Sequence, residues 1–278
     1  MTRAVCDSVS PLIPKPQTLI PSAVGTMGNA LVTTLLAPVC AVCSALLAEP
    51  LSGCVCAACW RSILYITPPI CARCGDPIAR LDAGCSGCSG HTKAVTRARA
   101  IGQYEGTLRE IIHALKYSGR HSLARPLAER MRQRGSELLE KVDCVVPVPL
   151  HWRREYERGF NQAREIARHL GLPVVDALVR RRSTRAQVEL AADRRRANVA
   201  GAFALRRSWL RNCAIRDQTV LLIDDVSTTG ATLDSCATVL RDAGASDVYA
   251  LTAARVVTRR IPTPQSLGRR SEPGSDSV

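Results

Sequence analysis

The sequence has no long hydrophobic run and few aromatic side chains. No apolar stretch approaches the roughly 18–20 residues that a membrane-spanning helix needs, so no membrane span is expected. Aromatic residues make up 4% of the 278 positions, which limits base stacking. Hydrophobic residues still reach 46% and charged residues only 22%, which excludes wholesale disorder. The length allows one large domain or two modest ones.

Lysine is scarce and arginine is abundant, and the basic residues are unevenly distributed. The chain has 34 Arg, 4 Lys and a net charge of +14. Residues 1–95 are nearly neutral, whereas residues 151–216 hold 16 Arg. The planar guanidinium suits phosphate better than an ammonium does, so the bias favours a polyanionic ligand. A GC-rich coding sequence would produce the same bias without any function.

The two ends of the chain differ from its middle. Residues 1–35 are expected to form a flexible leader with a short helix near residues 29–36, and residues 262–278 a disordered tail. Residues 30–42 are apolar, but the basic residues before them are too distant for a secretion signal. We expect two folded parts between the ends, at residues 36–92 and 93–261.

The first of these parts contains four C-x-x-C pairs in succession. Each pair directs two thiolates at one point, and two pairs close a tetrahedral four-sulfur site, so four pairs predict two structural zinc sites, most simply paired in sequence order. Cys54 either replaces Cys56 as a ligand or is a free thiol. The eight predicted ligands are Cys40, Cys43, Cys56, Cys59, Cys71, Cys74, Cys85 and Cys88.

Two other uses of these cysteines compete with zinc binding. Disulfides of a secreted protein are disfavoured, because adjacent C-x-x-C disulfides are unusual and no secretion signal supports them. A thioredoxin-like redox motif needs one C-x-x-C at the start of a helix, not four in tandem. The sequence therefore predicts zinc, a reducing compartment and a cytoplasmic location.

The second part alternates between strand and helix patterns. Alternation of this kind predicts an α/β fold with a mostly parallel sheet, whose ligands bind at the carboxyl ends of the strands. Expected strands lie at residues 98–104, 144–149, 220–223 and 247–252, and expected helices at residues 106–116, 123–140, 161–170 and 232–243.

The most specific motif follows the apolar strand at residues 220–223. Two carboxylates, Asp224 and Asp225, precede a small hydroxyl-rich loop that leads into a helix. Such a loop presents backbone N–H groups to an anion. It is not a Walker A loop, because the G-x-x-x-x-G-K-[ST] pattern is missing. A ribose 5-phosphate satisfies both features, since the loop takes the phosphate and the carboxylates take the sugar hydroxyls.

Residues 220–232 resemble the signature of type I phosphoribosyltransferases, which binds 5-phosphoribosyl 1-pyrophosphate (PRPP). Residues 104–117, 146–151, 157–163 and 198–203, together with a double zinc ribbon, resemble the ComF/GntX-like competence family. The resemblance covers roughly residues 36–257. It implies a type I phosphoribosyltransferase-like core behind a double zinc-ribbon module.

The resemblance also implies roles for individual residues. Asp224 and Asp225 would hold the ribose 2′- and 3′-hydroxyls. Residues of the following loop would bind the 5′-phosphate: Ser227, Thr228, Thr229, Gly230, Ala231 and Thr232. A third group would neutralise the pyrophosphate, although each could equally be a solvated surface residue: Lys116, His151, Arg153, Arg154 and Arg158.

The resemblance further implies Mg²⁺ bound with PRPP and transfer of the phosphoribosyl group to an acceptor that no motif identifies. Glutamine-dependent amination is not expected, because no glutaminase with a leading Cys precedes the core.

The arginine block at residues 180–207 is either a solvated insertion or a surface for single-stranded DNA, with Trp152, Tyr156, Phe160, Phe203 and Trp209 as stacking residues. The alternative function is a non-catalytic DNA-binding protein, linked to the DNA-uptake machinery, that uses PRPP as a regulatory ligand.

Overall fold

The computed structural model describes residues 22–79, 85, 87–88, 94–182, 201–206 and 215–257. Predictions for most of the leader, the tail, Arg185, Arg194–Arg196, Arg207 and Trp209 lie outside these residues. The helices are α1 (Ser22–Leu36), α2 (Ala57–Arg61), α3 (Gly106–Tyr117), α4 (Ala124–Arg134), α5 (Ser136–Leu139), α6 (Trp152–Arg158), α7 (Gln162–Ala167) and α9 (Ala231–Asp242), with short 3-10 turns at Pro50–Ser52 and His121–Leu123. The strands are β1 (Arg97–Gln103), β2 (Cys144–Pro147), β3 (Leu178–Arg180), β4 (Phe203–Leu205), β5 (Thr219–Ser227) and β6 (Asp247–Arg255).

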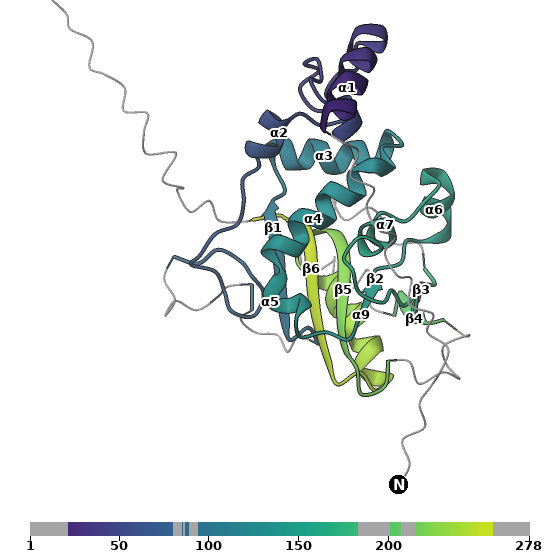
Figure 1. Ribbon diagram of the computed structural model, residues 1–278. Helices are drawn as coiled ribbons and strands as arrows, with labels where there is room; N and C mark the ends of the chain where they lie inside the picture. Colours follow the sequence, from purple (N-terminus) through teal and green to yellow (C-terminus); the bar gives the residue numbers. More distant parts are fainter. Residues whose placement is uncertain are drawn as a thin grey trace, which may run out of the picture.

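A four-stranded parallel sheet forms the centre of the second part (Figure 1). Its strand order is β1-β6-β5-β2, so the strand that comes last in the chain lies inside the sheet. The predicted α/β fold with a mostly parallel sheet is confirmed.

The two faces of the sheet belong to two separate hydrophobic cores. In β5, Leu221 and Ile223 pack with α3, α4 and α7 on one face, whereas Val220 and Leu222 pack with α9 and the β3–β4 hairpin on the other. Successive strand side chains point to opposite faces, and helices cover both. An uninterrupted apolar strand is the sequence pattern that this arrangement requires.

Three local features differ from the sequence predictions. The helix expected at residues 123–140 is interrupted at Gly135, which caps α4 before α5 begins. A Cβ on Gly135 would lie 2.7 Å from Leu251 Cδ2 and 2.8 Å from the Met131 oxygen, so the close approach of the sheet excludes a larger residue. Helix α6 and the antiparallel β3–β4 hairpin were not predicted.

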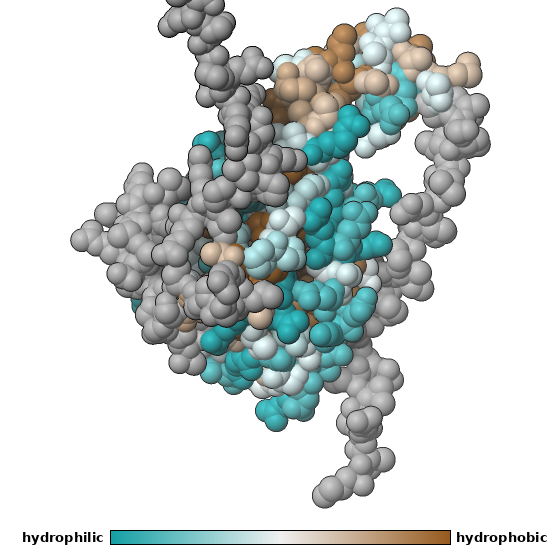
Figure 2. All heavy atoms as spheres, turned by 90° about the vertical axis from the view of Figure 1, so that its left-hand side faces the viewer, coloured by the Kyte–Doolittle hydropathy of each residue, from teal (hydrophilic) through white to brown (hydrophobic). Residues whose placement is uncertain are grey.

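The N-terminal part packs against helices α3 and α4 of the core. Ser62 Oγ lies 2.7 Å from Thr107 Oγ1 of α3, and the Arg130 guanidinium of α4 lies 3.7 Å from the Trp60 ring centroid. Helix α1 projects beyond this contact, and apolar surface gathers over it (Figure 2). Across the described residues, every helix is too short or too polar to span a bilayer.

Candidate functional site

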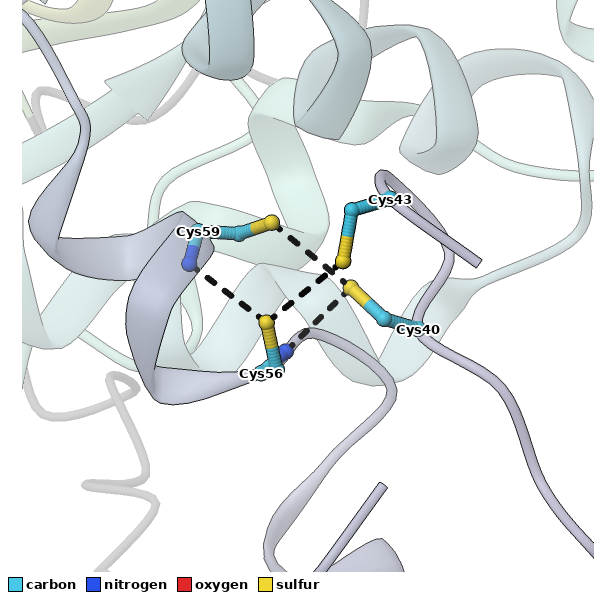
Figure 3. Close-up of side chains that lie close together, drawn as sticks. All are labelled: Cys40, Cys43, Cys56 and Cys59. Carbon is cyan, nitrogen blue, oxygen red and sulfur yellow. Dashed lines mark hydrogen bonds between the residues drawn. The ribbon is translucent and has the colours of Figure 1, made fainter. Parts of the chain in front are cut away.

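The eight cysteines of the C-x-x-C pairs form two four-sulfur clusters, paired in sequence order as expected. In the first cluster, Cys40 Sγ lies 3.8 Å from Cys59 Sγ, and Cys43 Sγ lies 3.7 Å from Cys56 Sγ (Figure 3). In the second, the Cys71–Cys88 and Cys74–Cys85 distances are 3.8 and 3.4 Å. Zinc–sulfur bonds of about 2.3 Å place the sulfurs of a tetrahedral site about 3.8 Å apart. The side chains therefore fit two structural zinc ions.

Backbone N–H groups in the first cluster favour the thiolate form of one ligand, Cys40. Burial alone would raise the pKa of Cys40, but backbone N–H donors, including those of Val42 and Cys56, lower it to about 6. Cys54 lies outside the cluster, with its Sγ 3.9 Å from Ser122 Oγ. Of the two alternatives for this cysteine, the geometry supports a free thiol, and Cys56 occupies the ligand position.

Residues 227–232, which we name the phosphate loop, connect the carboxyl end of β5 to the start of α9. Gly230 precedes the first turn of α9 with a φ of 78°, in the left-handed region that glycine adopts without strain. Thr228 and Thr232 face the large cavity described below. Ser227 is buried, and its Oγ has no hydrogen-bond partner among the described residues. The loop thus has the geometry of an anion site at a helix N-terminus.

The two aspartates at the end of β5 have different surroundings. Asp225 is buried, and its Oδ2 lies 3.0 Å from Lys116 Nζ of α3. Burial alone would lower the pKa of Lys116, but the charge of Asp225 outweighs this effect and raises it. Burial, reinforced by the charge of Asp225, raises the pKa of Asp224 to about 7, although the Asp225 N–H, Lys116 and Arg180 oppose the shift. One of the two carboxylates therefore changes charge near neutral pH.

A cavity of about 1000 Å³ joins these elements. Its lining includes Asp224, Asp225, Thr228 and Thr232, which come from the end of β5, the phosphate loop and the start of α9. Several predicted pyrophosphate ligands line the same cavity from α3 and α6: Lys116, Arg154 and Arg158. Arg158 donates to Gln162 Oε1 at 3.0 Å and to the Tyr117 hydroxyl at 3.2 Å.

Two predicted pyrophosphate ligands are not among the residues that line this cavity. His151 is buried at the start of α6, where its Nδ1 accepts from the Arg153 N–H at 3.4 Å. Burial and the nearby charges of Arg180, Arg153 and Arg154 lower the pKa of His151, which keeps it neutral. Arg153 is exposed, and its guanidinium lies 5.2 Å from the Trp152 ring centroid.

Sequence reasoning did not assign Arg180, Tyr104 or Gln162 to this site, although all three line the cavity. Gln162 is buried, and its Nε2 has no partner among the described residues. Burial and the like charge of Arg154 lower the pKa of Arg180. Arg180 was missed because it begins a run of arginines in the sequence that shows no strand pattern. Gln162 had only its position at the start of a predicted helix as a signal.

Each of the two parts of the molecule matches a known domain family. Residues 31–90 match the double zinc ribbon domain, and residues 135–264 match the phosphoribosyl transferase domain. Solved structures that resemble the chain include glutamine PRPP amidotransferase from B. subtilis, 22% identical over 48% of this chain and 26% of that one, with a TM-score of 0.32. A hypothetical protein from Neisseria gonorrhoeae with bound ppGpp is 17% identical over 63% of this chain and 80% of that one, with a TM-score of 0.27. The chain is a zinc-ribbon protein with a phosphoribosyltransferase-type core.

Similar proteins with curated names identify the family within this class. "DNA utilization protein YhgH" of Salmonella typhimurium is 30% identical, and "Competence protein F" of Haemophilus influenzae 29%, each over 70% of this chain and 87% of the relative. "Competence protein ComFC" of Bacillus subtilis is 27% identical over 68% of this chain and 79% of the relative. The chain belongs to this ComF family, whose members are named for competence and DNA utilization.

Proposed function

We propose that the chain binds PRPP with Mg²⁺ in the large cavity and acts as a phosphoribosyltransferase in DNA utilization. The observation that carries the proposal is one cavity lined by threonines of a hydroxyl-rich loop, by two carboxylates and by several basic side chains. PRPP has the matching sequence of groups: a 5′-phosphate, ribose hydroxyls and a diphosphate. The relatives named for competence and DNA utilization support the cellular role.

In this proposal the phosphate loop binds the 5′-phosphate, with the hydroxyls of Thr228 and Thr232 facing it. Asp224 and Asp225 accept hydrogen bonds from the ribose hydroxyls. Arg154 and Arg158 face the diphosphate, because guanidinium groups bind phosphate oxygens in a bidentate way. Lys116 neutralises Asp225 and lines the same cavity as Arg154 and Arg158.

The carboxylate and substrate oxygens suit Mg²⁺, which prefers oxygen ligands and retains several waters. When bound with PRPP, Mg²⁺ would help neutralise the leaving diphosphate. The bond from the anomeric carbon to the diphosphate oxygen breaks, and a bond from that carbon to the acceptor forms. Arg154 and Arg158 hold the charge that develops on the diphosphate.

Calorimetry with zinc-loaded protein and Mg²⁺ tests the proposal. We expect PRPP binding by the unmodified chain and its loss in the Asp224→Ala/Asp225→Ala variant. Asp217→Asn is a matched control, since Asp217 is exposed with a φ of 60°, which asparagine tolerates. No heat of PRPP binding from the unmodified protein would overturn the proposal. Pyrophosphate release on addition of bases, amines or oligonucleotides then identifies the acceptor.

A second candidate function, binding of single-stranded DNA, is favoured by the surface of α6. Trp152 is 64% exposed and Tyr156 is 87% exposed, close to Arg153 on the same helix. Exposed aromatic rings between cationic side chains stack on bases while the cations contact phosphates. If DNA binding is the main activity, PRPP is a regulatory ligand.

Measuring the affinity for a thymidine oligonucleotide at several salt concentrations separates the stacking of the aromatic rings from the phosphate contacts of the cations. We expect Trp152→Ala/Tyr156→Ala to weaken DNA binding roughly 10- to 100-fold with an unchanged salt dependence. Arg153→Ala should reduce the slope of affinity against salt by about one, because one phosphate contact is lost. Both variants should bind PRPP normally, since these residues do not line the cavity. Unchanged DNA binding in both would exclude α6 from the DNA surface.

A further inference from the structure

Residues next to both ends of the phosphate loop contact one segment of the N-terminal part. This segment is the second ribbon, which is the described part of residues 71–88, together with the linker at residues 94–96. The contacts involve buried or half-buried polar side chains, and none of them belongs to the proposed PRPP-binding set.

The upstream end of the loop is connected through β6. Ser227 is paired in register with Arg255, and the Val256 N–H donates to the Ser227 oxygen at 2.9 Å. The Arg255 side chain is only 5% exposed, and its Nε donates to the carboxylate of Asp76 in the second ribbon. Arg255 therefore joins the first residue of the phosphate loop to the ribbon.

Asp76 occupies a central place in the second ribbon. Its backbone oxygen accepts from the Cys71 N–H at 2.7 Å, within the first C-x-x-C turn. A Cβ built on Gly87, between the cysteines of the other pair, would lie 2.6 Å from Asp76 Oδ2. Asp76 thus lies against both halves of the four-cysteine site, with its backbone oxygen at one C-x-x-C pair and its carboxylate at the other.

The downstream end of the loop is connected through the first turn of α9. Asp234 Oδ1 accepts from the backbone N–H groups of Ala94 and Val95, at 2.7 and 3.3 Å. Further along α9, Arg241 Nε donates to the Ala94 oxygen at 2.6 Å. The linker that leaves the second ribbon is therefore attached along α9.

A small cavity lies where these contacts meet, and its lining includes Cys74, Gly230, Asp234 and Arg255. A ligand of the second four-cysteine site and the turn of the phosphate loop thus share one cavity. The first ribbon, at residues 40–62, has a different environment, since its contacts with the core include α3, α4 and the turn between them, and none of its described contacts is with the phosphate loop or α9. The two zinc sites are therefore not equivalent with respect to the loop.

We propose that Asp76, Arg255 and Asp234 are positioning residues through which the zinc-bound second ribbon fixes the phosphate loop. Zinc closure of the second site holds Asp76 in place, Asp76 holds Arg255 at the end of β6, and Asp234 holds the start of α9. The loop is then ordered before a phosphate arrives, which lowers the entropy cost of binding. This inference rests on the proposed binding of PRPP at the same loop.

The test compares a variant of each zinc site. Cys71→Ser disrupts the second site, and Cys43→Ser is the matched change in the first. We expect hydrogen exchange at residues 227–234 to rise about tenfold or more in Cys71→Ser and to stay unchanged in Cys43→Ser, while β2 serves as the internal reference. PRPP affinity should fall about tenfold in Cys71→Ser alone. Equal effects of the two variants on the loop would overturn the inference.

Asp76→Asn separates positioning from general folding, because it leaves all eight cysteines in place. We expect faster exchange in the loop, about tenfold weaker PRPP binding and full zinc content, and recovery in Asp76→Glu, which restores the charge. Asp234→Asn gives the same test at the other end if Asp76→Asn does not fold. Unchanged loop exchange in a folded Asp76→Asn protein would overturn the inference. If the unmodified chain binds no PRPP, the proposed function fails, and the exchange data still decide whether the ribbon orders the loop.

Discussion

Lys116 and Asp225 form an ion pair between α3 and the end of β5, and both side chains are largely buried. Their exposed fractions are 14% and 12%, so water screens the pair only weakly. Removing one partner from such a pair leaves an uncompensated charge in a poorly solvated place. The ion pair therefore offsets the negative charge that Asp225 contributes to the cavity lining.

We expect Lys116→Met to lower the free energy of unfolding by about 3 kcal/mol, because the buried Asp225 carboxylate loses its ion-pair partner. The double variant Lys116→Met/Asp225→Asn should recover most of this loss. Urea unfolding of the four proteins of the cycle measures the coupling. A double variant that is no more stable than Lys116→Met would show that the pair does not stabilise Asp225.

Asp224 gives the proposed site a pH dependence. Its pKa of about 7 means that the carboxyl is mostly neutral at pH 6 and mostly ionised at pH 8. The ionised form is the better acceptor for ribose hydroxyls and for Mg²⁺, so PRPP affinity should rise as the pH increases through 7. Folding responds in the opposite direction, because the unfolded carboxyl ionises near pH 4, and stability falls as the pH rises from 4 to 7.

Calorimetry at several pH values checks this expectation. The phosphates of PRPP also titrate, with a pKa near 6, so the comparison needs Asp224→Asn, which retains that contribution. The unmodified chain should gain more affinity between pH 6 and 8 than the variant does. Identical pH profiles would mean that Asp224 does not titrate in this range.

At the level of elements, the phosphate loop was predictable because its signals are local. An uninterrupted apolar strand, two acids, a hydroxyl-rich loop and a helix pattern follow one another between residues 220 and 243. The ion pair between Lys116 and Asp225 was not predictable, since the two residues are far apart in the sequence and only the tertiary packing of α3 against β5 brings them together. The three-residue strands β3 and β4 are too short for a periodic signal, and α6 is short, mostly charged and without buried residues, so it has no apolar stripe.

Gly135 shows how packing overrides a helix pattern. Alanine usually stabilises a helix relative to glycine by about 1 kcal/mol, but here the new Cβ would collide with Leu251 and the Met131 oxygen. We expect Gly135→Ala to destabilise the protein by about 1–3 kcal/mol in urea unfolding. Gly28→Ala in α1 is the comparison, because there the Cβ meets only the end of the Leu51 side chain. A stabilising Gly135→Ala would contradict the close contact.

For the whole molecule, the two four-cysteine sites predict a fixed metal content. We expect about two zinc ions per chain by metal analysis, and about one in either Cys43→Ser or Cys71→Ser. Chelation should also lower the unfolding temperature, because zinc binding and folding of such small modules are coupled. Zero zinc with oxidised cysteines would contradict both the metal sites and the expected reducing compartment.

The position of β6 inside the sheet has a consequence for protein synthesis. β1 and β5 do not pair with each other, and each finds its shared neighbour only when residues 247–255 have been made. At 5–20 residues per second, the ribosome needs roughly 8–30 s to proceed from β1 to the end of β6. During this interval the nascent chain carries unpaired strand edges, which promote aggregation. Premature termination before β6 therefore leaves a polypeptide that chaperones and proteases must handle, even though both zinc ribbons are already complete.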